Sequence, residues 1–490
     1  MSIDPDLGDA ARAAALRRTP VGLGMIAVYG SGTLADSITN TALNLFLFFY
    51  LTAVCGLPNS LAGLSGLVAL SVDALGDPLV GALSDNSHSR FGRRHPFMLG
   101  GILPLSIGLG LLFSIPTGLS GIGLFAFVVA VSVVLRVSHS AYFLPYVGLG
   151  AELSDDYTER TNIVSSRFLF SVLGTAGCVA LGQYVFMSGP GGNLHRAAYT
   201  PFGWTCAAFV LLGGLGTTFG TFPALKRMHK VVRSSVPLAR RLARDAIELA
   251  RNPSFRAIFF SLLLMFIAFG VVLSLTLHAN TFFWKLPGNI IGLILLAAPA
   301  GTLLAVLISV VLTRRFEKRE VVIVGLVGIC ILQGTLPLLK VIGLLPPNGA
   351  VLYALLIANA LGMGTLIALV GIAFQSAMAD AADEHEYLFG TRRESLYYAG
   401  LNLASKAATG IGGLVAGASL DLIGFPTNIA AKGGANIRIA PETLRDFGLI
   451  FGPGTAAIFV LSTTVFLFYR LDRRQTAEIQ AALSLRRKAD

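Results

Sequence analysis

Long apolar stretches recur along the whole chain and restrict its fold more than any other feature. Of the 490 residues, 54% are hydrophobic and only 13% are charged, a balance typical of a polytopic membrane protein and not of a soluble domain. The stretches long enough to cross roughly 30 Å of hydrocarbon are 22–52, 60–84, 96–116, 119–149, 163–187, 202–223, 255–283, 288–313, 320–342, 350–379, 394–424 and 447–469. The sequence therefore predicts an all-α membrane protein with 12 transmembrane helices.

Basic residues lie in every second connection between these stretches. Arg90, Arg93 and Arg94 follow the second stretch, and the segment 226–251 separates the sixth from the seventh, whereas the loop 56–59 has no basic residue. By the positive-inside rule we expect both termini and the central loop to be cytoplasmic, in a cell (inner) membrane. The net charge of +11 is thus explained by orientation signals, and no nucleic acid partner is expected.

Six stretches, a basic linker and six further stretches resemble the layout of a major facilitator. This fold binds its substrate near the midplane between two six-helix halves and works by alternating access. The predicted parts are a cytoplasmic N-terminal tail (1–21), an N-terminal half (22–224), a basic cytoplasmic linker (225–254), a C-terminal half (255–469) and a basic cytoplasmic tail (470–490).

Two carboxylates lie one helical turn apart inside the second stretch. Asp73 and Asp77 share a helix face at this spacing, and acidic side chains in hydrocarbon are costly unless something uses them. Two such groups aimed at one point repel unless they share a proton or hold a cation. We interpret the pair as a cation or proton site. The alternative, which Pro78 favours, is that the two residues cap or end a helix near the water boundary.

Three motifs in both halves carry a resemblance to a known family. They are DALGDP at 73–78 running on to SRFGRRHP at 89–96, PYVGLGAELSDDYTERT at 145–161, and DEHEYLFGTRRESLYY at 383–398. Together they resemble the loops of the glycoside–pentoside–hexuronide:cation symporters, the melibiose-permease family. Because the motifs fall in both halves, the resemblance covers essentially the whole chain.

The resemblance implies a cation site made by Asp73, Asp77, Ser140 and Lys406. In a sodium-coupled protein Asp73 and Asp77 would bind Na⁺. The position of Lys406 points to the same role independently of the resemblance. An unpaired ammonium in the middle of a membrane span is very costly, so Lys406 needs a carboxylate partner. A cation entering the pair would compete with Lys406 for the same oxygens.

The expected substrate site combines residues implied by the family with departures from its pattern. Asp36 and Arg167 match sugar-binding positions, whereas Phe143 and Val147 replace an acidic and an aromatic residue, so the fourth helix presents an apolar wall. Arg136 shares a helix face with Ser140, and it either pairs with Asp36 or awaits an anionic group of the substrate. The candidate substrate contacts are Asp36, Arg136, Phe143, Val147, Arg167 and Asn402.

Charged residues of the inner loops resemble a cytoplasmic gate of the facilitators, in which charge pairs hold the halves together. The candidate gate residues are Asp85, Arg90, Arg93, Arg94, Glu152 and Arg160. Since exposed pairs are individually weak, the expected effect is that of a network biasing one state.

The predicted function is cation-coupled symport, with Na⁺ or H⁺, of a small organic solute such as a glycoside, hexuronide or related sugar derivative. The loss of polar groups at Phe143 and Val147 leaves an alternative open, an amphiphile such as a lysolipid or another non-sugar organic anion. A non-transporting membrane sensor is a lesser alternative. No nucleophile elbow, zinc spacing or phosphate-binding loop points to an enzyme, so no cofactor beyond the coupling ion is expected, and we expect a monomer.

Overall fold

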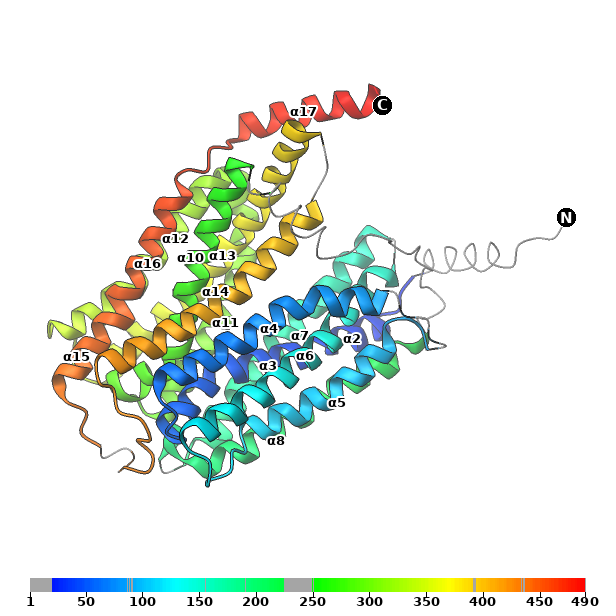
Figure 1. The fold of residues 1–490 in the computed structure, drawn as a ribbon. Coiled ribbons are helices and arrows are strands. Elements are labelled where there is room, and N and C mark those ends of the chain that lie inside the picture. The colour runs from blue at the N-terminus through cyan, green and yellow to red at the C-terminus, as the bar shows by residue number, and fades with distance from the viewer. Residues whose placement is uncertain are drawn as a thin grey trace. The chain divides into compact units, whose positions relative to one another are not determined.

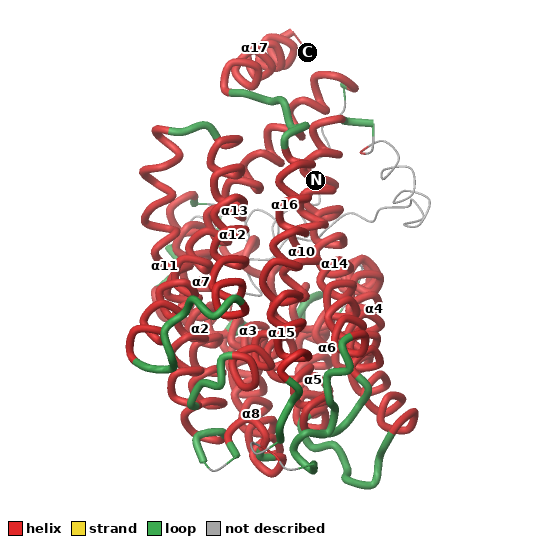
Figure 2. Tube along the Cα trace, turned by 90° about the vertical axis from the view of Figure 1, so that its left-hand side faces the viewer, coloured by secondary structure: helices red, strands yellow, loops and turns green. Residues whose placement is uncertain are grey.

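The computed structural model describes most of the two predicted halves. The described residues are 20–85, 87, 89, 91–154, 156–189, 191–223, 249, 251–390, 394–432, 434 and 437–489. The predicted N-terminal tail except its last residues, most of the basic linker, and the gate residue Arg90 lie outside them, as does the side chain of Asp85. Within the described part all regular structure is helical (Figures 1 and 2).

Helices cover all 12 predicted stretches, so the prediction of an all-α membrane protein is confirmed. In the first six stretches the elements are α2 (Leu23–Ser31), α3 (Thr33–Thr41), η1 (Ala42–Leu47), η2 (Tyr50–Val54), α4 (Asn59–Asp85), α5 (His95–Leu112), α6 (Gly121–Leu153), α7 (Tyr157–Ala180), η3 (Leu181–Phe186), η4 (Gly192–Leu194) and α8 (Arg196–Gly220). The segments η1, η2 and η3 are π-helical continuations of α-helices.

The second six stretches are formed in the same way. Their elements are α10 (Pro253–His278), η6 (Ala279–Phe283), α11 (Gly288–Arg315), α12 (Lys318–Val341), α13 (Ala350–Phe389), α14 (Glu394–Leu422), α15 (Pro441–Leu449), η8 (Ile450–Gly454) and α16 (Thr455–Phe466). The predicted C-terminal tail contains a further helix, α17 (Arg473–Ala489), which the sequence analysis did not predict.

Ten helices of the described chain are long and apolar enough to span a membrane. The first and eleventh predicted stretches are not among them. The first is divided at Gly32 into the shorter helices α2 and α3, where the amide of Gly32 bonds to the carbonyl of Tyr29. The helix α4, in contrast, continues through Pro78 to Asp85, so the alternative that Asp73 and Asp77 end a helix is wrong.

The chain forms two compact units. The first comprises 1–58, 68–235 and 427–437, and the second comprises 59–67, 236–426 and 438–490. In the first unit α5 packs against α6 and α8, and α3 packs against α7. Gly101 makes the approach of α5 to α6 possible, because a Cβ atom at this position would lie 2.6 Å from the carbonyl oxygen of Ser138.

Aromatic side chains fill the interior of the first unit. The ring of Tyr146 stacks on Tyr29 with centroids 4.8 Å apart, and Tyr50 stacks on Tyr199 at 4.3 Å. The buried hydroxyl of Tyr146 bonds to the hydroxyl of Thr33 at 2.7 Å. Stacking and a satisfied hydroxyl together fix α6 against the first transmembrane segment.

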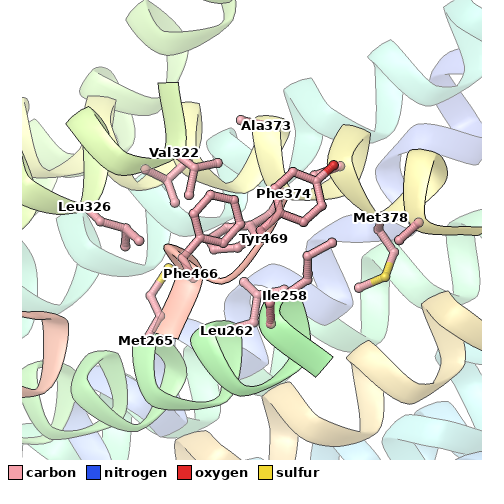
Figure 3. Packing of buried hydrophobic residues seen from close by; sticks show 14 of the residues in the cluster. Ile258, Leu262, Met265, Val322, Leu326, Ala373, Phe374, Met378, Phe466 and Tyr469 are labelled. Carbon is pink, nitrogen blue, oxygen red and sulfur yellow. The ribbon is translucent and has the colours of Figure 1, made fainter. Parts of the chain in front are cut away.

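The second unit has an apolar core of its own (Figure 3). Here α10 packs against α14 and α16, while α13 packs against α11 and α12. Phe374 meets the edge of Phe466 with ring centroids 5.0 Å apart, and Phe466 stacks on Tyr469 at 5.2 Å. Asn252 begins α10, and its side chain accepts a hydrogen bond from the amide of Phe255 at 3.0 Å, which satisfies a free donor of the first turn.

Candidate functional site

Three side-chain oxygens meet inside the first unit, between α4 and α6. The hydroxyl oxygen of Ser140 lies 2.9 Å from Oδ1 of Asp73 and 2.7 Å from Oδ1 of Asp77. The two carboxylates point to the same place because they are four residues apart on α4. The structure therefore brings together three of the four residues predicted to form the cation site.

The hydroxyl of Ser140 cannot satisfy all the oxygens around it. It has one proton, while three acceptors lie within reach: Asp73, Asp77 and the carbonyl oxygen of Arg136 at 3.2 Å. At least one carboxylate must therefore face the lone pairs of Ser140. An added proton or a cation bound by these oxygens relieves this repulsion, and hard cations prefer oxygen ligands of this kind.

Arg136 lies next to this group of oxygens and is deeply buried. Its Nη1 atom is 3.7 Å from Oδ2 of Asp73, and the side chains of Arg136 and Asp73 are only 7% and 1% exposed. Asp77 is half-buried. Buried charges persist only when they are paired, so we assign Arg136 as the counter-ion of Asp73.

Asp36 has polar partners on two helices. Its Oδ1 atom accepts a hydrogen bond from Asn40 Nδ2 at 2.7 Å and lies 2.9 Å from Nε2 of His139. Asn40 in turn accepts a hydrogen bond of 3.3 Å from Nη1 of Arg136. The sequence left open whether Arg136 pairs with Asp36 or awaits an anionic group of the substrate. In the structure Arg136 is connected to Asp36 through the side chain of Asn40. Sequence reasoning missed Asn40, although its spacing of four residues from Asp36 was a signal.

The residues expected to form the substrate wall are partly connected through aromatic rings. Phe143 stacks on His139 with ring centroids 5.4 Å apart and lies 6.0 Å from the ring of Tyr146. The guanidinium of Arg167 lies over the face of Tyr146, 5.5 Å from its centroid. Tyr146, which the sequence analysis did not assign to the site, is the link between Phe143 and Arg167. Val147 follows it on α6 and is half-buried.

Two predicted site residues belong to the second unit. Lys406 and Asn402 lie on α14, where Lys406 is half-buried and Asn402 is exposed. The roles of Lys406 in the cation site and of Asn402 in substrate binding stay predictions.

Arg93, Arg94 and Glu152 of the predicted gate form ion pairs within the first unit. Arg93 and Arg94, at the start of α5, both contact Oε1 of Glu152 at the end of α6, and the Arg94 pair measures 2.8 Å. Arg94 also donates a hydrogen bond of 3.3 Å to the carbonyl of Pro145. Arg160 donates to the carbonyl of Ser154 at 2.9 Å. Glu152 is therefore a shared acceptor that ties the start of α5 to the end of α6.

Comparison with known proteins places the chain in a family. The chain matches the family described as "MFS/sugar transport protein" over residues 28–473. It is 25% identical over 459 residues to the isoprimeverose transporter of Lactiplantibacillus pentosus, covering 91% of this chain and 88% of the relative. It is 38% identical over 152 residues to an uncharacterized symporter, sll1374, of Synechocystis sp., a match that covers 30% of this chain and 28% of that protein's length.

A solved structure shows the same fold. The crystal structure of the nucleoside transporter NupG superimposes with a TM-score of 0.60 at 13% identity, covering 90% of this chain and 98% of the other. The predicted major facilitator fold is thereby confirmed, and the protein is a multi-pass membrane transporter and not an enzyme. From the family match and the motifs that surround the site, the chain belongs to the glycoside–pentoside–hexuronide:cation symporter family of the major facilitator superfamily.

Proposed function

We propose that this protein couples the entry of a monovalent cation to the transport of a small glycoside or related solute. The observation that carries the proposal is the position of the Ser140 hydroxyl, within 2.9 Å of one carboxylate and 2.7 Å of another. The hydroxyl has a single proton and cannot donate to both carboxylates. The converging oxygens therefore carry excess negative charge, which favours binding of a cation.

The charges around the site favour a monovalent ion. Ionised Asp73 and Asp77 together with Arg136 carry a net charge of −1, which one Na⁺ or one proton neutralises. Arg136 pairs with Asp73 at 3.7 Å, and we assign Asp77, whose Oδ1 atom lies 2.7 Å from the Ser140 hydroxyl, as a further carboxylate of the ion site. Lys406 is proposed to compete for the same carboxylates when the ion leaves.

The proposed solute is a glycoside or a hexuronide. The isoprimeverose transporter matches this chain over most of its length, which supports a sugar derivative. Asp36 and His139 offer polar contacts to hydroxyl groups, while Phe143 and Tyr146 offer aromatic faces. Arg167 makes no ion pair with any described residue, so it suits the carboxylate of a uronide better than Arg136 does.

An amphiphile is the second candidate for the transported solute, because α6 presents apolar side chains to it. Phe143 and Val147 line α6 where the family has polar or aromatic groups, and an apolar aglycone or acyl chain would contact them without leaving polar partners unsatisfied. Transport is proposed to proceed by alternating access in a monomer whose termini are cytoplasmic.

Uptake into proteoliposomes tests the coupling. We expect accumulation of isoprimeverose or of a phenyl glucuronide when a Na⁺ or a proton gradient is imposed, and no accumulation by Asp77→Asn under either gradient. Asp446→Asn, at a half-exposed site on α15, is the matched control and should accumulate solute normally. Accumulation by Asp77→Asn equal to that of the unchanged protein would refute the proposal. Accumulation of a lysolipid alone would select the second candidate.

A further inference from the structure

Asn40 lies between Asp36 and the arginine that pairs with Asp73, so it connects the candidate solute site with the candidate ion site. On one side its Oδ1 atom accepts a hydrogen bond of 3.3 Å from Arg136, the counter-ion of Asp73. On the other side its Nδ2 atom donates a hydrogen bond of 2.7 Å to Asp36. A chain of polar contacts therefore runs from Asp77 to Asp36, and its longest step is the ion pair of 3.7 Å between Asp73 and Arg136.

The side-chain amide is the group that this position requires. A guanidinium only donates hydrogen bonds and a carboxylate only accepts them, so a group between them must accept at one end and donate at the other. Asn40 does both, and the charges on its two sides fix the orientation of its amide. A carboxylate at this position would repel Asp36, and an apolar side chain would leave Arg136 without this contact.

Arg136 is shared between two partners, and neither contact is short. It lies 3.7 Å from Asp73 and 3.3 Å from Asn40, whereas charged hydrogen bonds at their optimum are near 2.7–2.9 Å. A cation bound by Asp73 and Asp77 weakens the attraction of Asp73 for Arg136. The guanidinium then gains by moving toward Asn40, and its charge strengthens the hydrogen bond that Asn40 donates to Asp36.

The backbone around Asn40 can follow such a change. Asn40 lies in the last turn of α3, and the π-helical segment η1 begins two residues later, at Ala42. Short π-helical segments inside longer helices frequently mark functional sites. Asn40 is half-buried and the side chain of Asp36 is 20% exposed, so this end of the chain is not closed to a solute.

We infer that Asn40 is a positioning residue that transmits ion binding at Asp73 and Asp77 to the solute-binding carboxylate Asp36. This inference rests on the proposed cation coupling and names the route by which the ion and the solute influence each other. Because coupling free energy is reciprocal, we expect a change at Asp36 to alter the affinity for the ion, and we expect most of this effect to require the Asn40 side chain.

The test is a double-mutant cycle that needs no knowledge of the solute. Thermal unfolding of the purified protein is titrated with Na⁺ at constant pH, and with protons in choline chloride, to obtain the midpoint for the coupling ion. We expect Asp36→Asn to change this midpoint about fivefold or more when Asn40 is present, and by less than about twofold in the Asn40→Leu background. Asn40→Ala, which removes both the donor and the acceptor without adding a charge, should behave as Asn40→Leu does and replaces it if that variant does not fold.

A matched control comes from the next residue of α3. Thr41 bonds to Thr175 at 3.4 Å and lies outside the polar chain, so Thr41→Val should leave the full effect of Asp36→Asn. An equal effect of Asp36→Asn with and without the Asn40 side chain would overturn the inference while the cation coupling stands. The absence of any ion-dependent midpoint in the unchanged protein would instead refute the cation coupling, and the inference with it.

Discussion

Asp73 and Arg136 form an ion pair in which Nη1 lies 3.7 Å from Oδ2 and both side chains are more than nine-tenths buried. The pair joins α4 to α6 beside the hydroxyl of Ser140. We propose that the two carboxylates differ in role: Asp73 holds Arg136 as its counter-ion, while Asp77 takes part in binding the coupling ion.

Removing Asp73 should therefore harm stability more than removing Asp77. Asp73→Asn leaves Arg136 without its ion-pair partner in a buried position, which typically costs about 3–5 kcal/mol. We expect a clearly lower free energy of unfolding for Asp73→Asn than for Asp77→Asn in detergent. The double variant Asp73→Asn with Arg136→Gln should recover much of the loss. Equal destabilisation by the two single variants would contradict this division of roles.

Ser140 is expected to contribute an oxygen ligand and not only packing. Ser140→Ala should weaken the affinity for the coupling ion by about tenfold, because one of three converging oxygens is lost. Ser140→Thr keeps the hydroxyl and should stay within a few-fold of the unchanged protein. Ion titrations of thermal stability provide the measurement, and an unchanged midpoint in Ser140→Ala would exclude the hydroxyl from the ion site.

Glu152 should be the critical acceptor of the cytoplasmic gate. Glu152→Gln weakens the contacts of both Arg93 and Arg94, whereas Arg93→Ala removes only one of them. We expect both variants to shift the protein toward the inward-open state, Glu152→Gln more strongly, as measured by labelling of cytoplasmic cysteine probes. Glu478→Gln breaks an exposed pair with Arg474 on α17 and is the control expected to have no effect. Unaltered labelling in Glu152→Gln would argue against a gating role.

Arg167 and Arg136 should differ in their effect on solute charge. Arg167→Gln is expected to raise the dissociation constant of a glucuronide by about tenfold and to leave that of the neutral glucoside with the same aglycone nearly unchanged. Arg136→Ala, which disturbs the pair with Asp73, should instead weaken ion binding and so affect both solutes alike. Competition binding with the two solutes separates these outcomes, and a glucuronide-specific defect in Arg136→Ala would reverse the assignment.

Local patterns were sufficient to predict the helices and part of the geometry of the candidate site. Apolar stretches long enough to span a bilayer predicted all 12 segments, because in lipid the backbone must satisfy its own hydrogen bonds within each helix. The spacing of Asp73 and Asp77 placed both on one helix face for the same local reason. Ser140 was predicted from the resemblance to the family alone, since the residues around it do not indicate that it packs against α4.

The contacts between helices were decided by tertiary structure. The pairing of Arg136 with Asp73, and not directly with Asp36, depends on how α3, α4 and α6 rotate and approach one another, and glycines such as Gly101 set such distances. The spacing of Asn40 from Asp36 was a signal for a contact between these two residues, but the contact of Asn40 with Arg136 could not be predicted, because it depends on how α3 and α6 approach each other. The sequence by itself determined which segments cross the membrane and which carry charge, since these follow from periodicity and hydropathy. Only the packing of the helices decided which charges meet, because a buried charge takes its partner from whatever side chain the fold brings within a few ångströms.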